Sequence, residues 1–82
     1  MITAKQLRAL MHANPFKPFR VHLSDGSHHD VLNHDAAFVE AGTLDIGVDL
    51  NAEGFAQDII RCSILHITRI QDLPARKLRK AA

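Results

Sequence analysis

The sequence predicts a small, mainly β domain in which a short N-terminal helix precedes a five- to six-stranded antiparallel barrel. The chain has 82 residues, enough for one domain but too few for two full sheet layers, so a sheet of this size is expected to curl. A hydrophobic content of 46% predicts a folded core. Short segments with alternating apolar residues, separated by turn residues, follow the first helical pattern and indicate the strands.

The first expected element is a helix over about residues 4 to 12. Thr3 and Gln6 have the spacing of a capping box, which marks a helix start. Apolar residues then recur at helical spacing: Leu7, Leu10 and Met11. The helix should end before Pro15, because a residue that precedes proline is disfavoured in helical conformation. Two Pro and two Phe between residues 15 and 19 predict a stiff extended connector.

From Phe19 onward the apolar period changes to two, which is typical of half-buried strands. The expected strands cover residues 19–23, 27–32, 37–40, 44–50, 56–63 and 65–71. Asp25 and Gly26 supply the turn of a first hairpin. Ser63 and Ile64 leave room for only a single tight turn before the last strand. This order favours a closed or nearly closed barrel, since closure removes exposed strand edges.

Charge is distributed unevenly along the chain. Residues 1–71, the expected domain, carry six Lys/Arg against eight Asp/Glu, a net charge of −2. Residues 72–82 carry four basic residues against one acidic residue, and we expect them to form a frayed helical or disordered basic tail. The basic residues of this tail are Arg76, Lys77, Arg79 and Lys80.

The sequence offers little support for an enzyme or a membrane protein. Cys62 is the single cysteine and lies in an apolar run, where a thiol is usually a small core side chain. No glycine-rich phosphate loop or paired carboxylate motif is present, so we expect neither catalysis nor a cofactor. No apolar run approaches the roughly 18 residues of a membrane span, and no signal-like leader is seen. A cytoplasmic location is therefore expected.

One motif in the N-terminal half is distinctive. It consists of Pro15, Phe16, Pro18, Phe19, Leu23, Asp25 and Gly26. The chain resembles a set of short bacterial proteins of unassigned function that begin with a Leu-Arg helix and continue Pro-Phe-x-Pro-Phe-x-Val-x-Leu-x-Asp-Gly. Their second pattern, Val-x-His-Pro-Asp, corresponds to residues 31–35, where this chain lacks the proline. The resemblance covers about residues 1–71 and implies no activity.

The order of helix, meandering strands, tight turn and last strand is similar to that of SH3-like and Sm-like barrels. Residues 23–26 resemble the first strand and turn of Sm-like proteins. In that family the RNA pocket uses Asn and aromatic or His side chains after strand two and an Arg-Gly pair between strands four and five. Asn33 and His34 stand at the first place here, whereas Arg61 is followed by Cys62 rather than by glycine.

Three functional hypotheses remain. The first is a non-catalytic interaction module that forms a homo-oligomer through barrel edge strands, with Arg61, Thr68 and Arg69 on the outer side. The second is an Sm-like binder of single-stranded RNA or other nucleic acid. Its contacts would come from Asn33, His34, Arg61 and the tail cations Arg76, Lys77, Arg79 and Lys80.

The third hypothesis is a metal site on the first hairpin. Four of the six histidines lie on or beside it: His22, His28, His29 and His34. Strand alternation places the adjacent pair on opposite faces, so a single site needs His22 with one of them plus Asp30 or the loop histidine. The spacing matches no standard zinc motif, and solvated strand histidines are the alternative interpretation.

Overall fold

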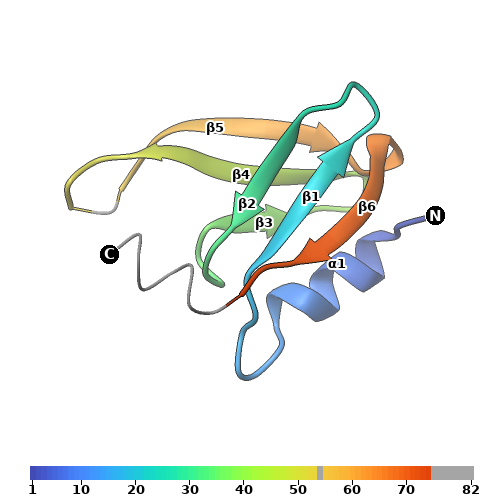
Figure 1. The fold of residues 1–82 in the computed structure, drawn as a ribbon, viewed down its shortest axis with the longest axis horizontal. Helices are drawn as coiled ribbons and strands as arrows, with labels where there is room; N and C mark the ends of the chain where they lie inside the picture. Colours follow the sequence, from blue (N-terminus) through green and yellow to red (C-terminus); the bar gives the residue numbers. More distant parts are fainter. Residues whose placement is uncertain (54, 75–82) are drawn as a thin grey trace.

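The protein is described by a computed structural model over residues 1–53 and 55–74 (Figure 1). The elements are α1 (Ala4–Met11), β1 (Phe19–Leu23), β2 (His28–Val31), β3 (Ala37–Val39), β4 (Thr43–Leu50), β5 (Ala56–Ser63), the 3-10 turn η1 (Ile64–His66) and β6 (Ile67–Asp72). The mainly β class with one short N-terminal helix is confirmed. Each expected strand is present, and the expected tight turn before the last strand is η1.

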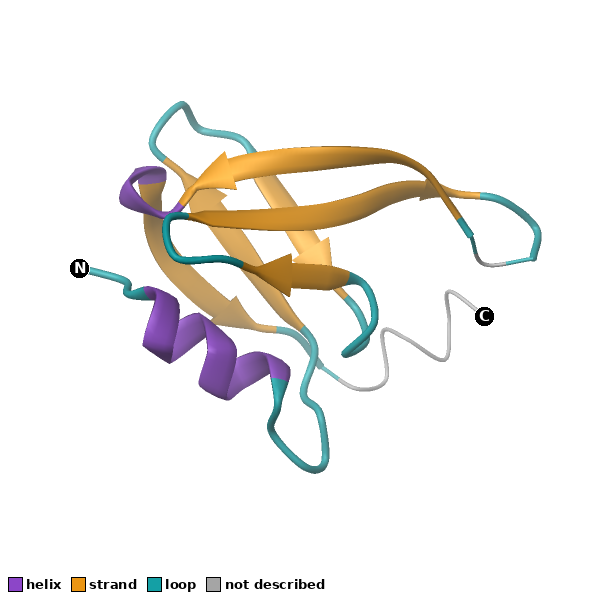
Figure 2. Cartoon of the chain, turned by 180° about the vertical axis from the view of Figure 1, so that it is seen from behind, coloured by secondary structure: helices purple, strands orange, loops and turns teal. Residues whose placement is uncertain are grey.

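Helix α1 begins where the capping box predicts. The Thr3 hydroxyl accepts a hydrogen bond from the Gln6 amide at 3.1 Å, and the Gln6 side chain accepts one from the Thr3 amide at 2.9 Å. The helix buries Leu7 and Met11 and runs beneath both sheets (Figure 2). Among the described residues, no helix is long and apolar enough to cross a membrane.

The described strands form two three-stranded antiparallel sheets, and the expectation of a closed barrel is wrong. One sheet has the order β2-β1-β6 and the other the order β3-β4-β5. Residues 32–36 separate β2 from β3, because the Asn33 side chain accepts the Asp35 amide at 3.0 Å and fixes a turn there. The 3-10 turn η1 separates β5 from β6, without a side-chain hydrogen bond at its cap. A single continuous ladder of strands is therefore interrupted at both junctions.

The first hairpin joins β1 and β2 through a tight turn at Gly26. Gly26 adopts a φ of 90° in its turn, a conformation that side chains other than glycine rarely take. Next to it, the Asp25 carboxylate accepts the Ser27 amide at 2.9 Å. On the face opposite the core, Arg20 and Asp30 form a two-bond ion pair with distances of 2.6 and 3.1 Å. Register is fixed because a one-residue slip would move these charges into the core.

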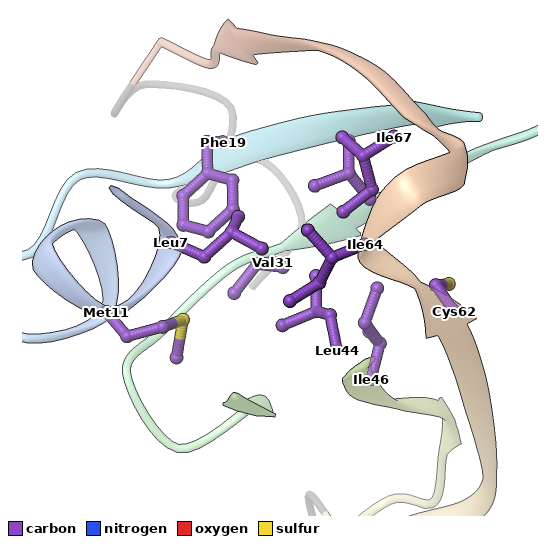
Figure 3. Close-up of a cluster of buried hydrophobic side chains, with 10 residues drawn as sticks. Leu7, Met11, Phe19, Val31, Leu44, Ile46, Cys62, Ile64 and Ile67 are labelled. Atoms are coloured by element: carbon purple, nitrogen blue, oxygen red, sulfur yellow. The ribbon is translucent and has the colours of Figure 1, made fainter. Parts of the chain in front are cut away.

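The hydrophobic core lies between the two sheets and α1 (Figure 3). Its fully buried side chains are Leu7, Phe19, Val21, Val31, Leu44 and Ile46. Burying each such side chain stabilises the fold by about 1.5 to 3 kcal/mol. Ile64 of η1 closes the core between the sheets, and its amide donates to the Gly42 carbonyl at 3.0 Å. The two sheets thus depend on the same small set of apolar contacts.

The folded part of the chain extends beyond residue 71, where the sequence predicts the tail to begin. Asp72 belongs to β6, and Leu73 is 8% exposed with its amide donating to the Pro18 carbonyl at 3.0 Å. The connector therefore holds the end of β6 in place. The predicted tail cations Arg76, Lys77, Arg79 and Lys80 lie outside the described residues.

Replacing Leu7 by alanine should lower the free energy of unfolding by about 2 to 5 kcal/mol, because α1 covers the core with this fully buried side chain. Leu65→Ala is the matched control, since Leu65 is 75% exposed, and it should change stability by less than about 0.5 kcal/mol. Urea unfolding followed by circular dichroism measures both. Equal effects of the two substitutions would contradict the described packing of α1.

Candidate interaction surface

Strand β5 is an exposed sheet edge. It has eight residues and, among the described strands, pairs only with β4 (Figure 1). An edge strand of this length presents a row of backbone groups that another strand can pair with. The residues expected on the outer side, Arg61, Thr68 and Arg69, are all exposed.

The pairing of β4 shows which way the backbone amides of β5 point. The Gly47 amide donates to the Ala36 carbonyl at 2.8 Å, on the β3 side of the sheet. Gly47 faces Ile59 in the register, and because the Gly47 amide points toward β3, the two residues form a non-hydrogen-bonded pair. The Ile59 amide therefore points away from β4. It donates instead to the Asp58 carboxylate at 2.8 Å, so this one edge donor is satisfied by a side chain.

The outer face of the β3-β4-β5 sheet carries exposed apolar side chains. Phe38 and Ile59 are 66% and 65% exposed and lie on the face opposite the buried Leu44 and Ile46. Between them a groove of about 480 Å³ crosses Gly47. We call this feature the outer groove; its lining is Ala36, Phe38, Asp45, Gly47, Ala56 and Ile59, with His34, Asp35 and Ala37 at its rim. Clustered apolar exposure of this kind is typical of binding surfaces.

An ion pair flanks the outer groove. Arg61 of β5 donates two hydrogen bonds to Asp45 of β4, at 2.9 and 3.0 Å. These hydrogen bonds hold the pKa of the Asp45 carboxyl below its usual range and, with the nearby Glu40 charge, raise the pKa of Arg61. Both side chains are fixed across the two strands, directly opposite each other in the register.

Three of the residues predicted to bind nucleic acid lie in the described part of the chain, and each has a partner within the fold. Arg61 is engaged by Asp45, and the Asn33 side chain holds the β2–β3 turn. His34 lies 3.0 Å from the Asp35 carboxylate and is exposed at the rim of the outer groove. All three side chains therefore already have partners within the chain.

The four histidines of the predicted metal site lie on different faces of the first hairpin and in the turn that follows it. His22 and His28 face each other across β1 and β2 with ring centroids 5.8 Å apart, and His22 Nε2 lies 2.9 Å from the Gln71 side-chain oxygen. His29 faces Val21 in the register, on the other side of the hairpin, and His34 is in the following turn. Among the described residues, no group of three or more His, Cys, Asp or Glu is placed to hold a metal ion.

A second pocket, of about 440 Å³, lies where the first hairpin meets β5 and η1. Ser24 Oγ and His66 Nδ1 are 3.2 Å apart at its wall, an arrangement that resembles a nucleophile beside a base. The carboxylate in this pocket, Asp25, accepts from Ser27 rather than from His66, so it does not orient the imidazole. Cys62 at the same pocket is buried, which raises the pKa of its thiol and disfavours the reactive thiolate.

Two features of these surfaces were missed from the sequence. The doublet Ile59 and Ile60 could have revealed the exposed apolar residue, because adjacent strand residues cannot both face the core. Ile60 packs against the core and Ile59 faces outward. The contact between Ser24 and His66 joins residues 42 positions apart, so no local sequence pattern predicts it.

No family model, curated protein or solved structure matches this chain. Its role therefore has to be inferred from the geometry of these surfaces.

The Asp45–Arg61 pair should make stability depend on pH in the acid range. A lowered carboxyl pKa stabilises the fold above the unfolded-state value of about 3.9, and this contribution is lost as the pH falls through the folded-state pKa. Asp45→Asn should therefore be less stable than the natural chain at neutral pH, with the difference shrinking below about pH 4. Arg61→Gln should behave similarly. Urea unfolding across the acid range measures this, and a difference that stays constant would refute the assignment.

Proposed function

We propose that this protein is a non-catalytic interaction module that self-assembles through the edge strand β5. The observation that carries the proposal is the eight-residue edge whose backbone, at Ile59, points away from β4. Antiparallel pairing with a strand of a second copy would satisfy this edge. The chain is also small, and association would bury surface that its single core leaves exposed.

The exposed apolar residues beside the edge support the same function. Ile59 belongs to β5 itself, and Phe55, which precedes the strand, is 68% exposed. Monomeric proteins rarely leave several large apolar side chains together on one sheet. Pairing through the edge would bring these side chains close to the second copy.

We further propose that the fold is a variant of the SH3-like or Sm-like class in which the two sheets remain separate. The element order agrees with that class: a helix, meandering strands, the short turn η1 and a last strand. Fold class alone does not assign a function, so the edge strand remains the basis of the proposal.

Ile59→Pro should abolish self-association, because proline removes the outward-facing amide that a second strand would need. The hydrogen bonds between β5 and β4 should survive, since the Ile59 amide donates to the Asp58 carboxylate and not to β4. Ile59→Val keeps the amide and is the matched control, which should retain the oligomer. Sedimentation velocity measures the mass, and circular dichroism verifies that each variant keeps its strands. A folded Ile59→Pro oligomer, or a natural chain that stays monomeric at high concentration, would disprove the proposal.

Asp58→Ala should strengthen self-association. In the isolated chain the Asp58 carboxylate accepts the Ile59 amide, and a second strand must displace it. Removing this competing hydrogen bond, worth about 0.5 to 1.5 kcal/mol, should lower the dissociation constant about 2- to 10-fold. A concentration series by sedimentation equilibrium measures the change. Weaker association in Asp58→Ala would show that the carboxylate supports the interface instead of covering its edge.

A further inference from the structure

The acidic residues of this chain are concentrated on one sheet. Residues 35–63, which contain the β3-β4-β5 sheet, carry six Asp/Glu and a single basic residue, Arg61. The six are Asp35, Glu40, Asp45, Asp49, Glu53 and Asp58. The outer groove lies on this sheet, so an apolar floor is combined with a local net charge of −5. A complementary occupant would be basic and carry an apolar side chain.

The groove has the form needed for such an occupant. Phe38 and Ile59 stand on either side of Gly47, and the missing side chain at this glycine lets Ala56 approach its backbone closely. A Cβ there would lie 3.0 Å from the Cβ of Ala56, so the Ala56 methyl group covers the glycine and forms part of the apolar lining. Asp35, which is well exposed, supplies negative charge at the rim. An apolar side chain of moderate size would therefore meet apolar walls and nearby carboxylates.

Residues 75–82 of the same chain have this chemistry. They contain four cations, no acidic residue and one apolar side chain larger than alanine, Leu78. Leu78 lies five residues beyond Leu73, a distance of at most about 16 to 18 Å when the chain is extended. The segment starts close to a fixed point, because the Leu73 amide donates a hydrogen bond to the Pro18 carbonyl of the connector. Phe16 of that connector lines one pocket together with His34, and His34 also lies at the groove rim.

We propose that the basic segment 75–82 docks onto the outer groove of its own chain, with Leu78 between Phe38 and Ile59 and its cations facing the acidic sheet. This intramolecular contact goes beyond the proposed self-assembly and does not depend on it. The groove lies on the face of the sheet, whereas strand pairing would use the backbone edge of β5.

Paramagnetic relaxation in the full-length chain tests the contact. A nitroxide is attached at Ala81→Cys in a Cys62→Ala background, and the isotope-labelled, spin-labelled protein is diluted with unlabelled protein. We expect loss of the amide signals of Phe38, Gly47 and Ile59. The loss should disappear near 1 M salt, where the screening length falls to about 3 Å. Unchanged signals at all three amides would overturn the proposal.

Matched variants identify what holds the segment. Lys77→Glu with Arg79→Glu should abolish the signal loss, whereas Lys5→Glu with Lys17→Glu, two exposed cations elsewhere, should leave it unchanged. Phe38→Ser should weaken the signal loss, and Leu65→Ser should not. The salt dependence of the groove amide shifts in the natural chain provides a second measurement that needs no change at Cys62. Amide shifts insensitive to both salt and tail charge would overturn the proposal.

A mixed sample distinguishes the two partners that the segment could reach. Spin-labelled chains without isotope are combined with isotope-labelled chains without a spin label. Signal loss at the groove confined to this sample would mean that the segment docks on a neighbouring copy, and the intramolecular proposal would be wrong. If Ile59→Pro is monomeric and still shows signal loss within one chain, the docking stands whether or not the natural protein self-assembles.

Discussion

The structure depends on a shared core that both sheets and the helix must use. Strand alternation gives each sheet one inner face, and the inner faces meet around Leu7, Phe19 and Leu44. Once these residues are buried, the side chains next to them along each strand must point to the outer face of the sheet. The Asp45–Arg61 pair and the exposed Ile59 lie on this outer face for that reason. The candidate interaction surface is thus the reverse side of the core.

Most elements of the fold could be predicted because their signals are local. The capping box at Thr3 starts α1, and the alternation through Leu44 and Ile46 predicts both β4 and its buried face. Barrel closure could not be predicted in this way, since it depends on what happens between strands. The sequence predicts that the second strand ends before Asn33, but nothing in the alternation shows that the next strand joins a different sheet.

The candidate site was harder to predict because its parts come from separate segments. The outer groove combines Phe38 of β3, Gly47 of β4 and Ile59 of β5, which become neighbours only through the register of the sheet. The histidine hypothesis rests on residues that are neighbours in the sequence. Its residues are close in sequence, yet alternation directs His28 and His29 to different sides of the hairpin. Proximity along a strand is therefore a poor guide to a shared site.

For the proposed self-assembly, the charge distribution favours one kind of strand pairing over another. Pairing β5 with β5 of a second copy would bring two acidic sheets together, each with a net charge of −5 over residues 35–63. Residues 1–34 and 64–74 carry five basic against three acidic residues, so pairing β5 with the β6 edge of a neighbour opposes unlike charges. At physiological salt, screening acts over about 8 Å, so charges close to the edge still contribute. A head-to-tail contact of this kind would build a ring or a filament, whereas pairing of β5 with β5 would build a two-fold dimer.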